Sequence, residues 1–234
     1  MSLYTKDKPQ TIASLFDHIA PHYDKGNAWL SCNLFRLWNR ALVQKLSRKN
    51  PTTFVDLCGG TGAITEALMK KTPLKKALIV DFSKGMLDVA EKRLKGFPIQ
   101  CITADIENLP LEENICDCAA VAYGIRNVND RVAALKEAKR ILIPGGTFAI
   151  LELSTPKNFI LKHMHALYLN KLVPWIGKRV AKDKKAYEYL SQSIQGFICA
   201  KQLEKEVLDA GFICVETKPL LFGSAVLITA TKPL

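Results

Sequence analysis

The feature that most constrains the fold is a regular alternation of short apolar runs with longer amphipathic runs over residues 53–153. Short apolar runs predict buried strands, and the amphipathic runs between them predict helices. Repeated strand–helix units imply a parallel sheet covered on both faces, with ligands at the carboxyl ends of the strands. The predicted strands are residues 53–57, 77–81, 99–103, 116–122 and 147–153; the predicted helices run to about Lys71, from Ser83 to before Gly96, and from Asn129 to Leu142, where Pro144-Gly145-Gly146 stops the last.

The two flanks differ from this central stretch. Residues 10–48 predict two amphipathic helices, and residues 158–210 predict a mostly helical stretch. Residues 212–219 and 225–231 predict a terminal pair of strands. A chain of 234 residues suits one α/β domain with a full core. We therefore expect a Rossmann-like, seven-stranded, mostly parallel sheet in a single domain, divided into N-terminal helices (1–50), a ligand-binding core (51–156), a helical cap over the carboxyl ends of the strands (157–210) and the strand pair (211–234).

The basic residues are concentrated in two segments. The 33 Lys and Arg residues exceed the 22 Asp and Glu residues, which gives a net charge of +11. Residues 51–156 are neutral, whereas residues 1–50 carry +5 and residues 157–185 carry +7. Such clustering is typical of a face for an anionic partner, either nucleic acid, a membrane surface or an acidic substrate. Solvated lysines that aid solubility are the alternative interpretation.

Targeting signals and metal motifs are not evident. The first residues lack the apolar core of a secretory signal, and no run approaches the roughly 18 apolar residues that span a bilayer. The seven cysteines are scattered and form no C-x-x-C motif, which predicts reduced, packed thiols in a cytoplasmic protein. His163 and His165 are two positions apart and would not share a helix face, so we expect no metal site.

A glycine-rich turn follows the first strand. Glycines there let a ligand approach the backbone, whose amides point outward at the start of the next helix. Such a turn suits either a nucleotide pyrophosphate or the carboxylate of S-adenosylmethionine; the dinucleotide motif needs a third glycine, and this chain has Thr65 at that position. Asp81 ends the second strand, where it can accept hydrogen bonds from ribose hydroxyls; a carboxylate that merely begins the next helix is the alternative. The turn comprises Asp56, Leu57, Cys58, Gly59, Gly60, Thr61 and Gly62.

Two further landmarks favour one of these ligands. Asp105 follows the third strand, where a carboxylate can meet the amine of an adenine, and Arg140 precedes the Pro144-Gly145-Gly146 turn. The landmarks, in this order, resemble those of S-adenosylmethionine-dependent methyltransferases. Transfer from a methyl sulfonium needs in-line geometry, a shielded cavity and an electron-rich acceptor.

The chain also resembles a narrower family, the C-methyltransferases of menaquinone and ubiquinone biosynthesis, which methylate a ring carbon of a polyprenyl quinol. The resemblance extends from about Phe16 to the C-terminus. The motifs that carry it are Tyr23-Asp24-x-x-Asn27, Leu30-Ser31 and Trp38, Gly59 to Gly62, Asp81-Phe82-Ser83 with Met86-Leu87, Tyr123-Gly124-Ile125-Arg126-Asn127-Val128, the run from Arg140 to Ser154, and Tyr187-x-Tyr189-Leu190-x-x-Ser193.

This resemblance implies S-adenosylmethionine as the cofactor and a lipophilic quinol as the partner substrate. Demethylmenaquinol is the acceptor we favour, and a polyprenyl methoxy-benzoquinol is the alternative, because both acceptors share these motifs. The chain departs from the expected pattern at Ala63, Phe35, Ile143 and Ile198, where the family has an acidic residue, a histidine, a lysine and a proline. The residues expected to contact the cofactor are Asp56, Gly59, Gly60, Thr61, Gly62, Asp81, Phe82, Met86, Asp105, Ile106 and Ala122.

The expected catalytic residues lie after the fourth strand and in the N-terminal helices. The acceptor is nucleophilic as a phenolate, and Arg126 is expected to stabilise this oxyanion while Asn127 orients it. Tyr23 and Asp24 would close the site, and His22 is a candidate proton acceptor. The structural alternatives are an ion pair of Arg126 with Glu152 or Asp130, and simple packing of Tyr23.

The cap segment mixes apolar residues with lysines, as does a helix that lies on a membrane surface. We expect residues 157–185 to contact an anionic membrane, so that the protein is peripheral to the inner face of the cell membrane; core packing or a homodimer interface is the alternative. Charge reversal at Lys178, Arg179, Lys182 and Lys184 would then weaken liposome binding. A nucleic-acid methyltransferase is not favoured, because no Asn/Asp-Pro-Pro-aromatic loop follows the fourth strand. A non-catalytic S-adenosylmethionine-binding protein stays open.

Overall fold

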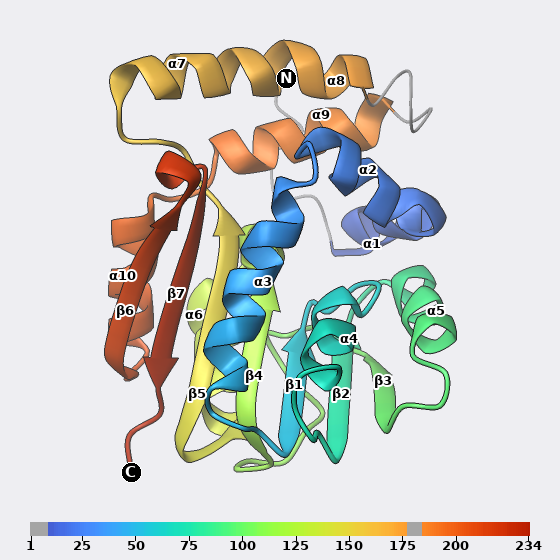
Figure 1. Cartoon of the computed structure of the whole chain (residues 1–234), viewed down its shortest axis with the longest axis vertical. Helices are drawn as coiled ribbons and strands as arrows, with labels where there is room; N and C mark the ends of the chain where they lie inside the picture. Colours follow the sequence, from blue (N-terminus) through green and yellow to red (C-terminus); the bar gives the residue numbers. More distant parts are fainter. Residues whose placement is uncertain (1–8, 177–183) are drawn as a thin grey trace.

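A computed structural model describes residues 9–176 and 184–234. Within these residues, the strands of the central sheet are β1 (Thr53–Leu57), β2 (Lys76–Asp81), β3 (Ile99–Thr103), β4 (Cys116–Ala122), β5 (Leu142–Leu153), β6 (Ile213–Leu220) and β7 (Ala225–Thr231). They form one seven-stranded sheet in the order β3-β2-β1-β4-β5-β7-β6 (Figure 1). Strands β1 to β5 are parallel, and β7 is antiparallel to β5 and β6. The predicted α/β fold, with its mostly parallel sheet, is confirmed.

The parallel strands bring their carboxyl ends to one edge of the sheet. Leu57, the last residue of β1, pairs with Val80 of β2 and with Val121 of β4. Asp81 in turn pairs with Thr103 at the end of β3. The strand order reverses direction at β1, and ligands of open α/β sheets bind in the crevice outside such a point. The ends of β1, β2 and β4 are therefore where a site should lie.

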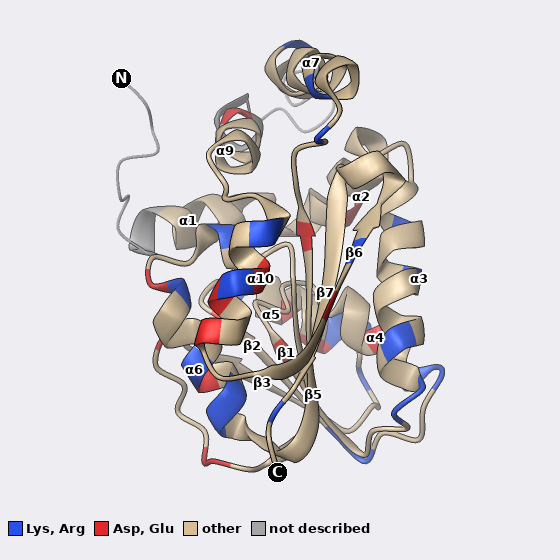
Figure 2. Cartoon of the chain, turned by 90° about the vertical axis from the view of Figure 1, so that its left-hand side faces the viewer, with Lys and Arg blue, Asp and Glu red and all other residues tan. Residues whose placement is uncertain are grey.

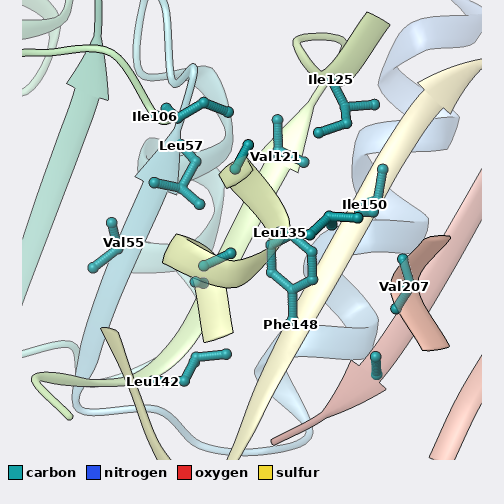
Figure 3. Close-up of a cluster of buried hydrophobic side chains, with 14 of the residues drawn as sticks. Val55, Leu57, Ile106, Val121, Ile125, Leu135, Leu142, Phe148, Ile150 and Val207 are labelled. Atoms are coloured by element: carbon teal, nitrogen blue, oxygen red, sulfur yellow. The ribbon is translucent and has the colours of Figure 1, made fainter. Parts of the chain in front are cut away.

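Helices cover both faces of the sheet. Because successive strand residues point to opposite faces, Val55 packs on one side and Phe54 on the other. On the first side, Leu135 and Val207 come from two helices to enclose strand side chains (Figure 3). The covering helices are α3 (Leu34–Ser47), α4 (Ala63–Met69), α5 (Lys84–Arg93), α6 (Arg131–Ile141) and α10 (Ala200–Asp209).

A group of helices lies beyond the carboxyl ends of the strands, as predicted for the cap (Figure 1). Their cohesion comes from a small apolar cluster in which Leu30, Leu169, Val173 and Ile194 are buried together. This group therefore roofs the edge at which a ligand is expected. It consists of α1 (Pro9–Ile19), α2 (Tyr23–Leu30), α7 (Phe159–Leu167), the π-helical η3 (Tyr168–Leu172), α8 (Val173–Ile176) and α9 (Lys184–Gln195).

Two sequence-based boundaries are wrong. The N-terminal segment holds three α-helices, not two, because the short 3₁₀ turn η1 (Ala20–His22) separates α1 from α2; Pro21 in that turn lacks the N–H that a continuous helix would use. The strand predicted to begin at Thr147 begins at Leu142, directly after α6 ends at Ile141. Leu142 is already extended and pairs with Cys116 of β4, so sheet pairing ends the helix.

The surface carries the charge, and the strands carry little of it. Figure 2 shows Lys and Arg on α3, α6 and α7, outside the sheet. All seven cysteines are free thiols, but Cys32, Cys199 and Cys214 are exposed, so the prediction of packed thiols is wrong for these three. None of the helices in the described part of the chain combines the length and the hydropathy that crossing a bilayer requires. Lys178, Arg179 and Lys182 lie outside the described residues, and so does the side chain of Lys184.

Candidate active site

The glycine turn between β1 and α4 is packed too tightly for side chains. A Cβ atom on Gly59 would lie 2.7 Å from Cγ2 of Ile79, and one on Gly62 would lie 2.9 Å from Cδ1 of Leu94. Gly60 and Gly62 have φ angles of 53° and 74°, a left-handed conformation that favours glycine. Beside Gly60, however, the nearest atom to an added Cβ is 4.0 Å away. The turn is thus fixed against β2 and α5, and its backbone at Gly60 is open to a ligand.

Asp81 lies at the end of β2 and faces this turn. Its Oδ2 accepts a hydrogen bond of 2.9 Å from the N–H of Gly60, and its Oδ1 accepts one of 2.9 Å from the N–H of Ser83. The carboxyl group is buried, and this burial raises its pKa to about 6. Each carboxylate oxygen has a further lone pair. Asp81 can therefore brace the turn and still accept a hydrogen bond from a ligand hydroxyl.

Asp56 forms the floor of the same region. Its Oδ2 accepts hydrogen bonds of 2.7 Å from the hydroxyl and 3.2 Å from the N–H of Thr65. Its Oδ1 is buried and has no hydrogen-bond partner among the described residues. Burial raises the pKa of this carboxyl group to about 7. A buried oxygen without a partner is costly, and a cationic ligand group at this point would satisfy it.

A pocket of about 720 Å³, partly open to solvent, lies over the turn, and we call it the glycine-turn pocket. It continues past Cys58 and Phe82 into a smaller pocket of about 360 Å³ that Asp105 and Ile106 line. Gly62 lies behind the wall, packed on α5. The other predicted ligand residues in the wall are Asp56, Gly59, Gly60, Thr61, Asp81, Phe82, Met86 and Ala122.

Helix α2 closes the glycine-turn pocket and is tied to the turn by charge. Asp24 forms an ion pair with Arg93 of α5, and its Oδ1 accepts a hydrogen bond of 3.0 Å from the hydroxyl of Thr61. Arg93 also donates a hydrogen bond of 2.9 Å to the carbonyl oxygen of Thr61. On α1, Asp17 accepts hydrogen bonds of 2.6 Å from the hydroxyl of Ser83 and 2.8 Å from the N–H of Gly85. Asp24 therefore fastens the N-terminal helices onto the pocket.

A second cavity, of about 1020 Å³, lies between the sheet edge and the cap, and we call it the apolar cavity. Tyr23, Asn27, Phe35 and Tyr123 line both it and the glycine-turn pocket, so the two spaces share a wall. Apolar side chains dominate the rest of its surface, namely Leu30, Leu34, Trp38, Leu153, Leu169, Val173, Leu190, Ile194 and Leu221.

Arg126 lines the apolar cavity and is also part of a buried ion pair. Its Nη1 donates a hydrogen bond of 2.8 Å to Oε1 of Glu152, and its Nε donates one of 3.3 Å to the hydroxyl of Ser193. The structural alternative with Asp130 is wrong, because Asp130 caps α6 by accepting a hydrogen bond from Ala133. Burial raises the pKa of the nearby Tyr23 hydroxyl, and the charge of Arg126 acts in the opposite direction. The field of Arg126 thus reaches a phenol in the cavity wall.

The sequence does not indicate the hydrogen-bond partners of several residues of the site. Tyr123 has a φ of 58°, rare for a bulky residue, and its hydroxyl donates a hydrogen bond of 2.8 Å to Oδ1 of Asn39. Asn127 lies on the glycine-turn pocket, where its Oδ1 accepts a hydrogen bond of 3.1 Å from the hydroxyl of Tyr189. Tyr123 and Tyr189 belong to motifs noted above, but their partners are 84 and 62 residues distant.

Neither His165 nor His22 lies between the glycine-turn pocket and the apolar cavity. His165 lines the apolar cavity and stacks on Tyr168 with ring centres 6.4 Å apart, and burial lowers the pKa of its imidazole. His22 is the last residue of η1 and does not line either cavity. Within the described residues, no three His, Cys, Asp or Glu side chains gather as they would around a metal ion.

Comparisons with known proteins give the chain its relatives. The sequence model of the ubiE/COQ5 methyltransferase family matches residues 4–232. The demethylmenaquinone methyltransferase of Protochlamydia amoebophila (strain UWE25) is 42% identical over 241 residues, which cover all of both chains. That of Chlamydia pneumoniae is 42% identical over 212 residues, covering 90% of this chain and 91% of the relative.

Solved structures share the fold. The structure of a complex between the Haloferax volcanii Trm112 methyltransferase activator and a methyltransferase matches with a TM-score of 0.69 and 21% identity, covering 94% of this chain and 98% of the other. An S-adenosylmethionine-dependent methyltransferase of Thermotoga maritima matches with a TM-score of 0.59 and 22% identity, covering 92% and 98%. These structural similarities agree with the family match over the whole length of the chain. The chain belongs to the ubiE/COQ5 methyltransferase family and is an S-adenosylmethionine-dependent enzyme.

Proposed function

We propose that this enzyme methylates a ring carbon of a polyprenyl hydroquinone, with demethylmenaquinol as the acceptor. The observation that carries the proposal is the junction of two unlike spaces, a pocket over the glycine turn that the buried carboxyl groups of Asp56 and Asp81 line, and a large apolar cavity. A methyl donor in the first would face an acceptor ring in the second across Tyr23, Asn27, Phe35 and Tyr123. The chlamydial relatives are named demethylmenaquinone methyltransferases, which supports a naphthoquinol acceptor rather than a benzoquinol.

The glycine-turn pocket fits S-adenosylmethionine in charge. The partnerless Oδ1 of Asp56 suits the ammonium group of the methionine half, and Asp81 suits the ribose hydroxyls. Asp105 in the adjoining pocket suits the adenine amine. When bound, S-adenosylmethionine supplies a methyl carbon on a positively charged sulfur, which keeps the bonding electron pair as the methyl group leaves.

Arg126 is proposed to make the acceptor nucleophilic. A phenol has a pKa of about 10, so most of the quinol is protonated at neutral pH. A buried guanidinium beside the acceptor hydroxyl favours the phenolate, because charges interact strongly away from water. The hydroxyl proton passes to water, and the ring carbon next to the phenolate gains electron density. The ring regains its aromatic form when the proton on the methylated carbon also passes to water.

The remaining predicted residues act around this centre. We infer that Asn127 orients the acceptor oxygen from the donor side of the junction, since its amide lines the glycine-turn pocket and not the apolar cavity. Tyr23 belongs to both walls and would exclude water from the methyl path. Asp24 acts indirectly, since its pairing with Arg93 holds α2 closed over the donor. His22 is outside both cavities, and we give it no role.

Binding of S-adenosylmethionine is expected to depend on pH through Asp56. Burial raises the pKa of this acid to about 7, and only the ionised form attracts an ammonium group. Affinity should therefore fall as pH drops below 7. The fall is about tenfold between pH 6 and pH 5, because the ionised fraction of Asp56 decreases about tenfold for each pH unit well below its pKa. Titration calorimetry from pH 5 to pH 7.5 measures this. Asp56→Asn should bind weakly with a flat profile from pH 7.5 to pH 6.5, above the pKa of about 6 to which burial raises Asp81, and an unchanged slope in this variant over that interval would contradict the assignment.

The direct test of the proposed function uses purified enzyme, labelled S-adenosylmethionine and reduced lipid extracts from cells that lack the menaquinone methylation step. The methylated product is identified by mass. Label in a naphthoquinol of one added methyl group is the expected result. Label in a benzoquinol would show that the acceptor is a benzoquinol instead, and label only in RNA would overturn the proposal. Binding of S-adenosylmethionine without any product would favour a non-catalytic role.

We also propose that the cap rests on an anionic membrane, from which a quinol can reach the apolar cavity. Helix α7 exposes Phe159, Ile160 and Met164 by 80%, 67% and 61%. Phe222, exposed by 79%, lies in the turn η5 (Leu221–Gly223) at the same end of the molecule (Figure 1). Its neighbour Leu221 lines the apolar cavity, so the exposed apolar surface is continuous with the cavity wall. Exposed lysines of the cap segment, Lys157, Lys162 and Lys171, suit anionic headgroups.

Replacing Phe159, Ile160 and Met164 with serine is expected to lower binding to phosphatidylglycerol vesicles by about tenfold or more, because each apolar side chain contributes through its buried area. Sedimentation with vesicles measures the bound fraction. Leu208→Ser is the control, since Leu208 of α10 is also exposed, by 48%. Unchanged vesicle binding would contradict the membrane proposal. Dissociation of a homodimer in sedimentation velocity would instead assign the α7 surface to a second copy.

A further inference from the structure

The two residues proposed to act on the acceptor are consecutive and are held by one helix. Arg126 and Asn127 lie in the 3₁₀ turn η2 (Ile125–Asn127) that follows β4. The hydroxyl of Ser193 contacts the first, and the hydroxyl of Tyr189 contacts the second. Ser193 and Tyr189 are four positions apart on α9, so they lie on the same face of that helix. Helix α9 therefore contacts η2 through a matched pair of hydroxyl groups.

The contact between Ser193 and Arg126 fixes the plane of the guanidinium. The hydroxyl of Ser193 donates a hydrogen bond of 2.9 Å to the carbonyl oxygen of Leu190, which leaves a lone pair for Nε of Arg126 at 3.3 Å. At the other edge, Nη1 contacts Glu152 and the carbonyl oxygen of Tyr123. A planar group held on two edges has one orientation. Ser193 is fully buried, so water cannot replace its hydroxyl.

The contact between Tyr189 and Asn127 fixes an amide. The hydroxyl of Tyr189 donates to Oδ1 of Asn127 at 3.1 Å, so the NH₂ group of the same amide points away from Tyr189. Asn127 lines the glycine-turn pocket, and Tyr189 lines a small pocket with Tyr23 and Arg126. An asparagine amide has two ends of opposite polarity. A tyrosine on one end thus decides which polarity faces the substrates.

Helix α9 also contacts the η3 and α8 part of the cap. Leu190 and Ile194 pack in the cluster that contains Leu169 and Val173. The hydroxyl of Ser191 donates a hydrogen bond of 2.8 Å to the carbonyl oxygen of Leu169 in η3. One helix therefore connects the η3–α8 part of the cap to the turn that carries the acceptor-facing residues.

We propose that α9 is part of the catalytic apparatus, with Ser193 and Tyr189 as positioning residues that set the orientation of Arg126 and Asn127. The proposal rests on the acceptor role given to Arg126 and Asn127 above. Its consequence is that the cap must be seated for the methyl acceptor to be ionised and oriented. A cap that served only as a roof would not require these two hydroxyls.

The test of Ser193 has a matched control on the same helix. Ser193→Ala is expected to lower kcat by about tenfold, the effect of one lost hydrogen bond on a rate, and to move the acidic limb of the kcat–pH profile to higher pH. The KM for S-adenosylmethionine should not change. Ser191→Ala also removes a buried hydroxyl, but one that contacts η3 and not Arg126, so the pH profile should stay as in the wild type. Ser193→Thr, which keeps a hydroxyl, should restore the profile.

The test of Tyr189 is a double-mutant cycle. Tyr189→Phe is expected to lower kcat by about tenfold with little displacement of the pH profile, because the amide of Asn127 carries no charge that would favour the phenolate. In the background of Asn127→Ala, the same change should have an effect of less than about twofold. Additive effects of the two changes would overturn the positioning role of Tyr189.

A measurement made in the absence of the quinol tests the positioning role independently of the proposed function. In protein labelled with ¹⁵N-arginine, the Nε–H resonance of Arg126 should shift and exchange faster in Ser193→Ala but not in Ser191→Ala. An unaffected resonance, or equal kinetics of the two alanine variants, would overturn the proposal. A wild-type enzyme that methylates no quinol, while the resonance responds as expected, would instead refute the proposed acceptor and leave the positioning contact established.

Discussion

The double variant Arg126→Gln/Glu152→Gln is expected to transfer methyl groups about two to three orders of magnitude more slowly than the wild type, the usual cost of removing one group that stabilises an oxyanion. Both members are changed because the pair is buried, with side-chain exposures of 2% and 0%. Removing Arg126 alone would leave Glu152 charged in the interior, which costs about 3–5 kcal/mol of folding stability. The neutral pair can keep one hydrogen bond in the same space.

The measurements are the rate of methyl transfer to reduced demethylmenaquinone and the affinity for S-adenosylmethionine by calorimetry. Affinity should change little, because Arg126 lines the apolar cavity and not the glycine-turn pocket. Arg131→Gln/Glu206→Gln removes a second Arg–Glu pair, which is partly exposed and joined by two hydrogen bonds of 2.8 Å away from either space, and should remain active. A double variant of Arg126 and Glu152 with wild-type transfer would reduce their pairing to a structural ion pair.

Asp81→Asn is expected to weaken the binding of S-adenosylmethionine by about a hundredfold. Two ribose hydroxyls would each lose a hydrogen bond to a charged acceptor, and such bonds contribute about 1.5–3 kcal/mol each. The substitution also replaces an oxygen that braces Gly60 or Ser83, so the turn itself is loosened. Calorimetry with S-adenosylhomocysteine measures the change without turnover.

Asp88→Asn is the control for this loss. Asp88 lies on α5 directly beyond Asp81, is exposed, and pairs with Lys84 at 2.9 Å. Its removal lowers the local negative charge by the same amount but leaves the glycine-turn pocket intact. Equal losses in the two variants would show that bulk charge, rather than contact with the ribose, accounts for the effect of Asp81.

The sheet could be predicted from the sequence because its signals are local. The apolar runs of β1, β2 and β4 are short, buried on both faces and bounded by turns, and their periodicity survives in the structure. The order of Asp56, Asp81 and Asp105 along successive strands likewise predicts that they meet, because parallel strands end at one edge. In contrast, the start of β5 at Leu142 depends on pairing between Leu142 and Cys116, which no local signal reveals.

The site was less accessible to sequence reasoning where it depends on contacts across the fold. Arg126 had two interpretations, and the structure combines them, since the side chain pairs with Glu152 and lines the apolar cavity. Asn39 and Arg93 belong to none of the sequence motifs, and Ser193 belongs to one that does not indicate its contact, because their partners are 84, 69 and 67 residues away in the chain. Residue type alone carries no information on such partners. The geometry of the helices that close the site is what creates them.

The fastening of α2 to the glycine turn has a kinetic consequence. Tyr23 and Asn27 of this helix form walls of both the glycine-turn pocket and the apolar cavity, and Asp24 holds the same helix to Arg93. A movement of α2 that releases the spent nucleoside would at the same time uncover the quinol ring. Both products should therefore leave after the same opening of α2, so that one conformational step sets the rate of release of each.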